Sequence, residues 1–184
     1  MNTTDFVILL VEAAGGSIQG RTVLQKRAFF VSVLSDLKLD FRAHYYGPFS
    51  PSIDAAVSQL KSLGFIDERT IGFGSIGTLG LEVKRYDYVL TDDGQKIAGS
   101  LKKRKKEEYG KIVNSLKRIE KAGNPNYSEL SIAAKAFFIL TQKAKPMART
   151  EIMREAQSFD WRIDDSSLQR TVSFLEKLGL VNKS

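Results

Sequence analysis

The amino-acid sequence predicts a mainly α protein with small β-hairpins, an α+β fold whose basic unit occurs twice along the chain. Three observations lead to this expectation. Apolar residues recur at helical spacing in several segments of the 184-residue chain, a glycine-rich segment separates two short β-rich runs, and the pattern that ends one helix returns near residue 180.

The first 37 residues are expected to form two helices. Apolar residues keep a helical spacing over residues 5–14 and again over residues 22–37. The segment 15–20 between them contains three glycines, which favour a turn. We therefore expect a helix, a short link and a second helix.

A third helix is expected to begin at Pro51. Proline is tolerated at the first helical position, where its missing N–H costs nothing, and Ser50 before it is a suitable N-cap. Gly64 is placed to end this helix. Its apolar face is predicted to consist of Ile53, Val57, Leu60 and Leu63.

Two strands are expected next, over residues 65–69 and 86–90. The chain between them carries Gly72, Gly74, Gly77 and Gly80, which suit the tip of a hairpin. Residues 91–94 then offer N-cap candidates for another helix. Three helices followed by a hairpin are typical of a winged helix-turn-helix, so the fold predicted is a winged helix-turn-helix in tandem.

The second unit is predicted from an internal similarity. Residues 57–67 align without gaps on residues 172–182, and both segments leave a helix through Leu-Gly. Residues 164–167 are expected to cap the later helix, and residues 122–126 form a turn-rich break before the unit. We therefore predict a winged-helix domain over residues 1–95, a basic linker helix over 96–122, and a second helix-turn-helix or winged-helix-like domain over 123–184.

The net charge of +7 is concentrated in one segment. Residues 96–121 contain ten Lys or Arg against three Glu, while the rest of the chain is balanced. Such a segment beside a winged helix is typical of a phosphate-backbone contact, and it is equally consistent with the solvated face of a long helix. The later recognition helix also offers Gln and Arg, which read base edges. The candidate DNA contacts are Lys102, Lys103, Arg104, Lys105, Lys106, Gln59, Lys61, Lys84, Arg85, Ser167, Gln169 and Arg170.

The amino-acid composition and the apolar pattern exclude several classes of protein function. The chain contains no cysteine, so disulfides and thiolate chemistry are excluded. The apolar run 6–11 is too short to span a membrane and lacks the basic start of a signal peptide, so a cytoplasmic protein without membrane association is expected. We expect no catalytic residue, no cofactor and no metal site.

Three short motifs are weak signals for other functions. Residues 72–77 match G-x-G-x-x-G, but a strand is expected after them where a dinucleotide site needs a helix. Glu82 and Lys84 resemble the end of a metal-dependent nuclease motif in a position too exposed to hold Mg²⁺. His44 has no marked nucleophile beside it, and Tyr45, Tyr46 and Phe49 are expected to fill a helix junction.

A family resemblance adds to this interpretation. The segments 20–26 (Gly-Arg-Thr-Val-Leu-Gln-Lys), 41–50 with its Tyr-Gly-Pro-Phe-Ser element, 60–66 and 88–94 resemble the YwgA-like prokaryotic proteins and, more distantly, the Panacea-type antitoxin domain. The resemblance covers about residues 15–98. It implies a winged-helix-like fold in a bacterial or archaeal protein and transfers no catalytic residue.

The function predicted from the sequence is double-stranded DNA binding without catalysis, as a prokaryotic transcriptional regulator that can act as a homodimer. The alternative is a protein-interaction module, such as an antitoxin or a phage-defence adaptor, whose same helices dock a protein partner. The two differ in their response to salt, because phosphate contacts release counterions and apolar docking does not.

Overall fold

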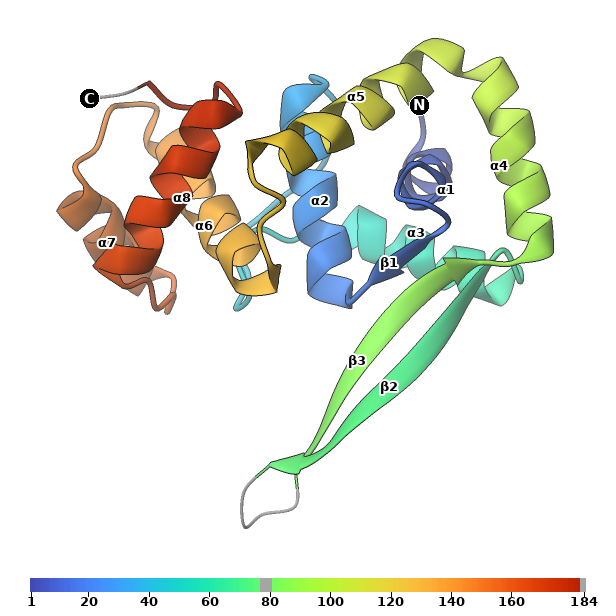
Figure 1. The fold of residues 1–184 in the computed structure, drawn as a ribbon, viewed down its shortest axis with the longest axis horizontal. Coiled ribbons are helices and arrows are strands. Elements are labelled where there is room, and N and C mark those ends of the chain that lie inside the picture. Colours follow the sequence, from blue (N-terminus) through green and yellow to red (C-terminus); the bar gives the residue numbers. More distant parts are fainter. Residues whose placement is uncertain (77–80, 183–184) are drawn as a thin grey trace. The chain divides into compact units, whose positions relative to one another are not determined.

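The computed structural model describes residues 1–76 and 81–182, and it confirms a mainly helical α+β protein with one small antiparallel sheet in that part of the chain (Figure 1). The helices and strands are α1 (Thr3–Ala13), β1 (Ser17–Gln19), α2 (Arg21–Leu34), α3 (Pro51–Ser62), β2 (Ile66–Ile76), β3 (Leu81–Leu90), α4 (Asp92–Arg104), α5 (Lys106–Ala122), α6 (Tyr127–Lys143), α7 (Arg149–Ser158) and α8 (Asp165–Lys177).

Contacts within the chain group it into two compact units. Unit 1 comprises residues 1–24 and 51–113, and unit 2 comprises residues 25–50 and 114–184. The division falls inside α2 and inside α5, so both helices contribute to both units. The predicted domains, residues 1–95, 96–122 and 123–184, were defined as parts of the chain that fold independently, which differs from units defined by contacts. These domain limits remain a prediction.

The core of unit 1 is built around α1. The side chain of Asn2 accepts a hydrogen bond from the N–H of Asp5 at 2.7 Å and caps the helix. All residues of the apolar run Phe6 to Val11 are buried, because α1 packs against α3, α4 and the sheet. A helix that is buried around most of its circumference needs apolar residues on every side, which explains the unbroken run.

The sheet has the order β1-β3-β2, with both neighbouring pairs antiparallel. The strand β1 is absent from the sequence-based prediction, since its three residues lie among glycines that favour a turn. Its pairing with β3 buries Ile18 between two exposed neighbours. These three residues therefore form a strand because they pair with β3, which is distant in the sequence and which a local pattern of three residues does not show.

The hairpin strands exist where predicted but are longer. Pairing runs from Ile66 opposite Leu90 to Ile76 opposite Leu81, with a bulge between Gly72 and Ser75. Figure 1 shows the hairpin extending well beyond the helices of its unit. The predicted glycine-rich tip includes residues 77–80, which lie outside the described residues.

The predicted cap of α4 is confirmed, and the predicted basic helix is corrected. Thr91 Oγ1 accepts a hydrogen bond from the N–H of Gly94 at 3.0 Å. Gly94 packs so closely that a Cβ atom there would lie 2.0 Å from the carbonyl oxygen of Phe65. The segment 96–122 is not one helix, because Lys105 leaves helical geometry at φ −122° and ψ 46° and separates α4 from α5.

Unit 2 buries an aromatic core among α6, α7, α8 and the C-terminal part of α2. The Phe30 and Phe174 rings meet edge-on with centroids 5.7 Å apart, and Phe29 contacts Phe137 in the same way at 6.3 Å. Trp161 is almost fully buried, and its indole N–H donates to the carbonyl oxygen of His44 at 2.7 Å. The core of unit 2 therefore packs against the segment 35–50 as well as against the helices of the unit.

The segment 35–50 between α2 and α3 is held by two adjacent residues of α2. Gln25 Nε2 donates to the carbonyl oxygen of Ser50 at 3.1 Å, and Gln25 Oε1 accepts from the Ser50 N–H at 2.9 Å. The Nζ of Lys26, a residue only 2% exposed, donates to the carbonyl oxygen of Pro48 at 2.7 Å. Burial, with a smaller contribution from Lys135, lowers the pKa of Lys26 to about 7.

Among the described residues, none of the helices combines the length and the apolar character that crossing a membrane requires. Nor does this part of the chain bring three or more His, Asp or Glu side chains together in a cluster that could hold a metal ion.

Candidate nucleic-acid interface

The basic segment 102–106 divides into paired and open cations. Lys102 Nζ lies 2.5 Å from Glu12 Oε1, and Lys105 Nζ lies 3.5 Å from Asp5 Oδ2. The hydrogen bond to Glu12 raises the pKa of Lys102. Both lysines therefore attach the α4–α5 corner to α1, and part of this predicted DNA contact has a structural role within unit 1.

Three cations of the same segment point to solvent. Lys103, Arg104 and Lys106 are exposed and have no ion pair with any residue that the structure describes. They lie around the end of α4 and the start of α5. We call Lys103, Arg104 and Lys106 the open cations. Their charges are available to a partner without first breaking an internal pair.

The predicted contacts on α3 are close to neutral. Lys61 Nζ lies 2.7 Å from Glu68 Oε1 on β2, and Gln59 Oε1 accepts a hydrogen bond from Thr4 Oγ1 at 3.3 Å. Near the other end of α3, Asp54 pairs with Arg21 at the start of α2. The exposed face of α3 therefore offers polar groups with little net charge.

The predicted contacts on the hairpin differ from each other. Arg85 binds Asp87 on the same strand through two hydrogen bonds, from Nε at 2.7 Å and from the terminal nitrogen at 2.9 Å. This pairing raises the pKa of Arg85. Lys84 is exposed and lies opposite Gly72 in the antiparallel register. Arg85 is half-buried, so the exposed Lys84 side chain is the more accessible of the two to solvent.

The predicted contacts on α8 lie in its first half. Asp164 accepts hydrogen bonds from the Ser166 hydroxyl at 2.6 Å and the Ser167 N–H at 2.9 Å, which confirms the predicted cap and holds the pKa of Asp164 well below its usual range. Arg170 donates to Ser167 Oγ at 3.1 Å, and its Nε lies 3.9 Å from Glu129 Oε1. Gln169 is exposed.

The aromatic segment 44–49 has a different role from the one expected. The Phe49 ring lies at a tilt to the His44 ring with centroids 4.9 Å apart, but Tyr45 and Tyr46 are 67% and 53% exposed. The expectation that the tyrosines fill a helix junction is therefore wrong. The carbonyl of His44 accepts the Trp161 hydrogen bond, so the backbone of this segment, held by Gln25 and Lys26, is what packs.

The weak motifs acquire no site. Residues 72–76 belong to β2, so the described part of the G-x-G-x-x-G match is strand, and Gly77 lies outside the described residues. The backbone of Glu82 belongs to β3, and its side chain lies outside the part of the chain whose side chains are described. None of these residues gives a reason to expect chemistry.

The acidic partners of the basic segment were missed from the sequence. Asp5 and Glu12 flank the apolar run of α1 seven residues apart, a spacing that places both on one side of a helix. Lys102 and Lys105, three residues apart, share one side of the α4 end. Matching spacings of opposite charge are the signal that could have suggested this pairing.

The chain matches no protein-family model and no curated protein.

Proposed function

We propose that the protein binds double-stranded DNA without catalysing a reaction and acts as a prokaryotic transcriptional regulator. One observation carries the proposal: α1, β1, α2, α3, β2 and β3 follow in the order of a winged helix, with α3 directly before a long hairpin. In that arrangement the helix before the hairpin enters the major groove and the hairpin lies beside the phosphate backbone.

We assign the phosphate contacts first to Lys103, Arg104 and Lys106. These exposed cations need not leave an internal partner to meet a phosphate, whereas Lys102 and Lys105 would have to abandon acids on α1. Lys84 extends the basic surface along the hairpin, and Gln59 and Ser58 on the exposed side of α3 are suited to base edges or phosphates.

The second unit is proposed to add base reading through α8. Ser167, Gln169 and Arg170 lie in its first half, and Gln and Arg make paired hydrogen bonds to adenine and guanine. Repetition of the recognition helix and a homodimer are both compatible with a palindromic site.

One feature departs from the usual helix-turn-helix. The link between α2 and α3, residues 35–50, is much longer than the usual turn of about three or four residues.

The test is DNA binding measured by fluorescence anisotropy over a range of salt concentrations. The decisive variant changes Lys103, Arg104 and Lys106 to Gln. The matched control changes Lys145, Arg154 and Arg162 to Gln, which removes the same charge from exposed positions in unit 2. The slope of log affinity against log salt is expected to fall by about 0.9 for each phosphate that the first variant no longer neutralises, and little in the control.

Equal slopes in the two variants would remove the open cations from the interface. Absence of binding by the wild-type protein even at low salt would reject the DNA proposal.

A protein-interaction module is the second candidate. The near-neutral face of α3 and the exposed apolar side chains Leu63, Ile71 and Tyr86 on α3's end and the hairpin favour a protein partner over a polyanion. Binding of a partner through this surface would change little between low and high salt, and Leu63→Ser would weaken it while leaving any DNA binding intact.

A further inference from the structure

A short hairpin-like loop of unit 2 carries two tyrosines at its tip. At its base, Arg42 and Phe49 exchange two backbone hydrogen bonds, at 3.0 Å and 2.9 Å. The Gly47 N–H donates to the carbonyl oxygen three residues earlier at 2.8 Å, which makes Tyr45 and Tyr46 the two central residues of a β-turn. We call the loop from Arg42 to Phe49 the tyrosine loop.

Side chains from elsewhere in unit 2 hold the backbone of the tyrosine loop and of the residue after it. Alternate carbonyl oxygens each accept a hydrogen bond from one of these side chains. The pairs are Trp161 Nε1 to His44 at 2.7 Å, Ser131 Oγ to Tyr46 at 3.2 Å, Lys26 Nζ to Pro48 at 2.7 Å and Gln25 Nε2 to Ser50 at 3.1 Å. The tip is therefore ordered before any partner arrives, which lowers the entropic cost of binding.

The two tyrosine rings stay outside the aromatic core of their unit. Tyr45 and Tyr46 are 67% and 53% exposed, whereas Phe137, Phe138 and Trp161 are buried. The tyrosine rings meet edge-on, with centroids 4.9 Å apart and an angle of 88° between their planes. An edge-on pair covers only one face of one ring, so flat aromatic faces remain open to another flat group.

The charge at the tyrosine loop is positive. Arg42 is the only Lys, Arg, Asp or Glu among residues 41–50. A Cβ atom at Gly47 would lie 3.0 Å from Lys135 Cγ and 3.2 Å from Lys26 Cε, so two further basic side chains pack against the turn. Burial lowers the pKa of both lysines, and an approaching anion would favour their charged forms.

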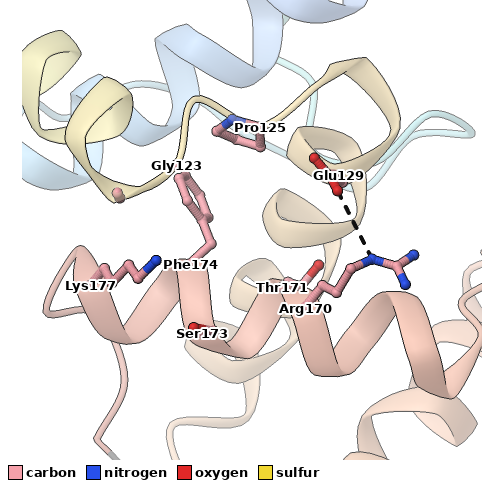
Figure 2. A pocket seen from close by; sticks show the side chains of 9 residues that line it. Gly123, Pro125, Glu129, Arg170, Thr171, Ser173, Phe174 and Lys177 are labelled. Carbon is pink, nitrogen blue, oxygen red and sulfur yellow. Dashed lines mark ion pairs between the residues drawn. The ribbon is translucent and has the colours of Figure 1, made fainter.

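Two other cations of unit 2 lie near carboxylates. Figure 2 shows Arg170 of α8 approaching Glu129 of α6, with Nε and Oε1 3.9 Å apart. Lys143 Nζ lies 2.6 Å from Glu155 Oε1. Arg42 differs from both, because it is exposed and has no ion pair with any residue that the structure describes. Its charge is therefore available to an anion.

We propose that the tyrosine loop binds single-stranded nucleic acid. Unpaired bases stack on Tyr45 and Tyr46, and Arg42 neutralises a neighbouring phosphate. A single strand is a polyanion that also exposes flat aromatic faces, whereas the bases of a duplex are stacked on one another. Positive charge beside open rings therefore favours a single strand over a duplex or an apolar peptide. The site lies in unit 2 and does not depend on the duplex contacts proposed for unit 1.

The test uses a labelled oligothymidylate of about ten nucleotides, a length within the range of known single-strand sites. Its binding is measured by fluorescence anisotropy at low salt in the protein with Lys103, Arg104 and Lys106 changed to Gln, which removes the open cations of unit 1. An abasic strand of the same length carries the same charge without bases. We expect the oligothymidylate to bind more tightly than the abasic strand and to shift the ring signals of Tyr45 and Tyr46 saturably in NMR spectra.

Four variants in this background locate the binding. Tyr45→Ala and Tyr46→Ala are each expected to weaken oligothymidylate binding about fivefold or more, because each removes a stacking surface. Tyr45→Phe keeps the ring and should restore binding. Tyr86→Ala, which removes a tyrosine of unit 1 that is 40% exposed, is the matched control and should bind as the background protein does. Thermal unfolding establishes that each variant is folded.

The contribution of Arg42 is measured by salt dependence. Arg42→Gln leaves the backbone bonds of the loop in place, and it should reduce the slope of log affinity against log salt by about 0.7, the value for one phosphate of a single strand. Duplex binding by the wild-type protein should not change with Tyr45→Ala or Tyr46→Ala, so this proposal and the proposed function can fail separately.

The proposal is overturned if the abasic strand binds as tightly as the oligothymidylate, or if folded Tyr45→Ala and Tyr46→Ala proteins bind as the background protein does. It is also overturned if Tyr86→Ala causes an equal loss. Absence of saturable shifts at the Tyr45 and Tyr46 rings would reject nucleic acid as the partner of this loop and favour a protein.

Discussion

The helices α3 and α8 have similar sequences but different surroundings. Each ends through Leu-Gly, with the glycine at φ +73° in Gly64 and +71° in Gly179. After each glycine the next N–H bonds the carbonyl five residues earlier, Phe65 to Leu60 at 2.9 Å and Leu180 to Leu175 at 3.0 Å. The repeated sequence therefore produces the same helix ending twice.

The buried faces of the two helices differ at aligned positions. Ala56 on α3 corresponds to Thr171 on α8, and the exposed Gln59 corresponds to the buried Phe174. A strand follows α3, whereas no strand follows α8 within the described residues. The similar sequence therefore determines how each helix ends, while the neighbouring elements determine whether a given position is buried or exposed.

The largest expected effect tests the equivalent core positions. Leu60 and Leu175 are almost fully buried, so Leu60→Ala and Leu175→Ala should each lower the free energy of unfolding by about 2–5 kcal/mol. Urea denaturation followed by circular dichroism measures this. Leu63→Ala, at a position 55% exposed, is the control and should cost far less. A small effect at Leu175 alone would show that α8 is less firmly packed than α3.

A smaller effect is expected when α3 receives the residue that α8 has at the aligned buried position. Ala56→Thr places a hydroxyl in the buried face of α3, where we expect it to cost about 1–3 kcal/mol of unfolding free energy. The control Ala55→Thr makes the same change at an exposed neighbour. Equal stability of the two variants would contradict the apolar packing described for α3.

The shared helix endings predict a matched pair of effects. Gly64→Ala and Gly179→Ala each force a Cβ atom into left-handed backbone, at a cost of about 1–2 kcal/mol. A Cβ at Gly64 meets nothing within 4 Å, and one at Gly179 meets only an Arg118 nitrogen at 3.9 Å, so conformation rather than collision sets both costs. Clearly unequal shifts of the unfolding midpoint would break the equivalence of the two endings.

The smallest expected effect has the opposite sign. Thr171→Val removes a buried hydroxyl without a partner among the described residues, so the variant should be as stable as wild type or more stable by up to about 1 kcal/mol. Differential scanning calorimetry measures the difference. Strong destabilisation would mean that this hydroxyl has a partner in solution that the protein itself supplies.

Local signals in the sequence predict the helix starts well. The start of α3 at Pro51 follows from the preference of proline for the first helical position, and α4 and α8 begin directly after the N-caps Thr91 and Asp164. The Asn126 and Glu129 capping box is a signal of the same kind that could have indicated the start of α6. The strand β1 could not be predicted locally, because its pairing with β3, distant in the sequence, determines it. The break at Lys105 carries no local glycine or proline signal either.

The sequence predicts which charged residues make up the candidate site, but not which of their side chains are available to a partner. The cluster of positive charge at residues 102–106 is visible in the sequence, yet only the fold shows that Lys102 and Lys105 meet acids of α1. The burial of Thr171 without a hydrogen-bond partner for its hydroxyl among the described residues was not foreseen, since it arises only once the neighbouring residues are in place. Pairing and burial are tertiary properties, and they separate binding residues from structural ones.

The most direct test of the proposed function is an NMR titration of the protein with a DNA duplex at low salt. We predict shifts of the backbone amides of Lys103, Arg104 and Lys106 and of the exposed side of α3, with signals of the buried segment of α1 unchanged. Absence of specific shifts, or shifts confined to residues far from the open cations, would contradict the account.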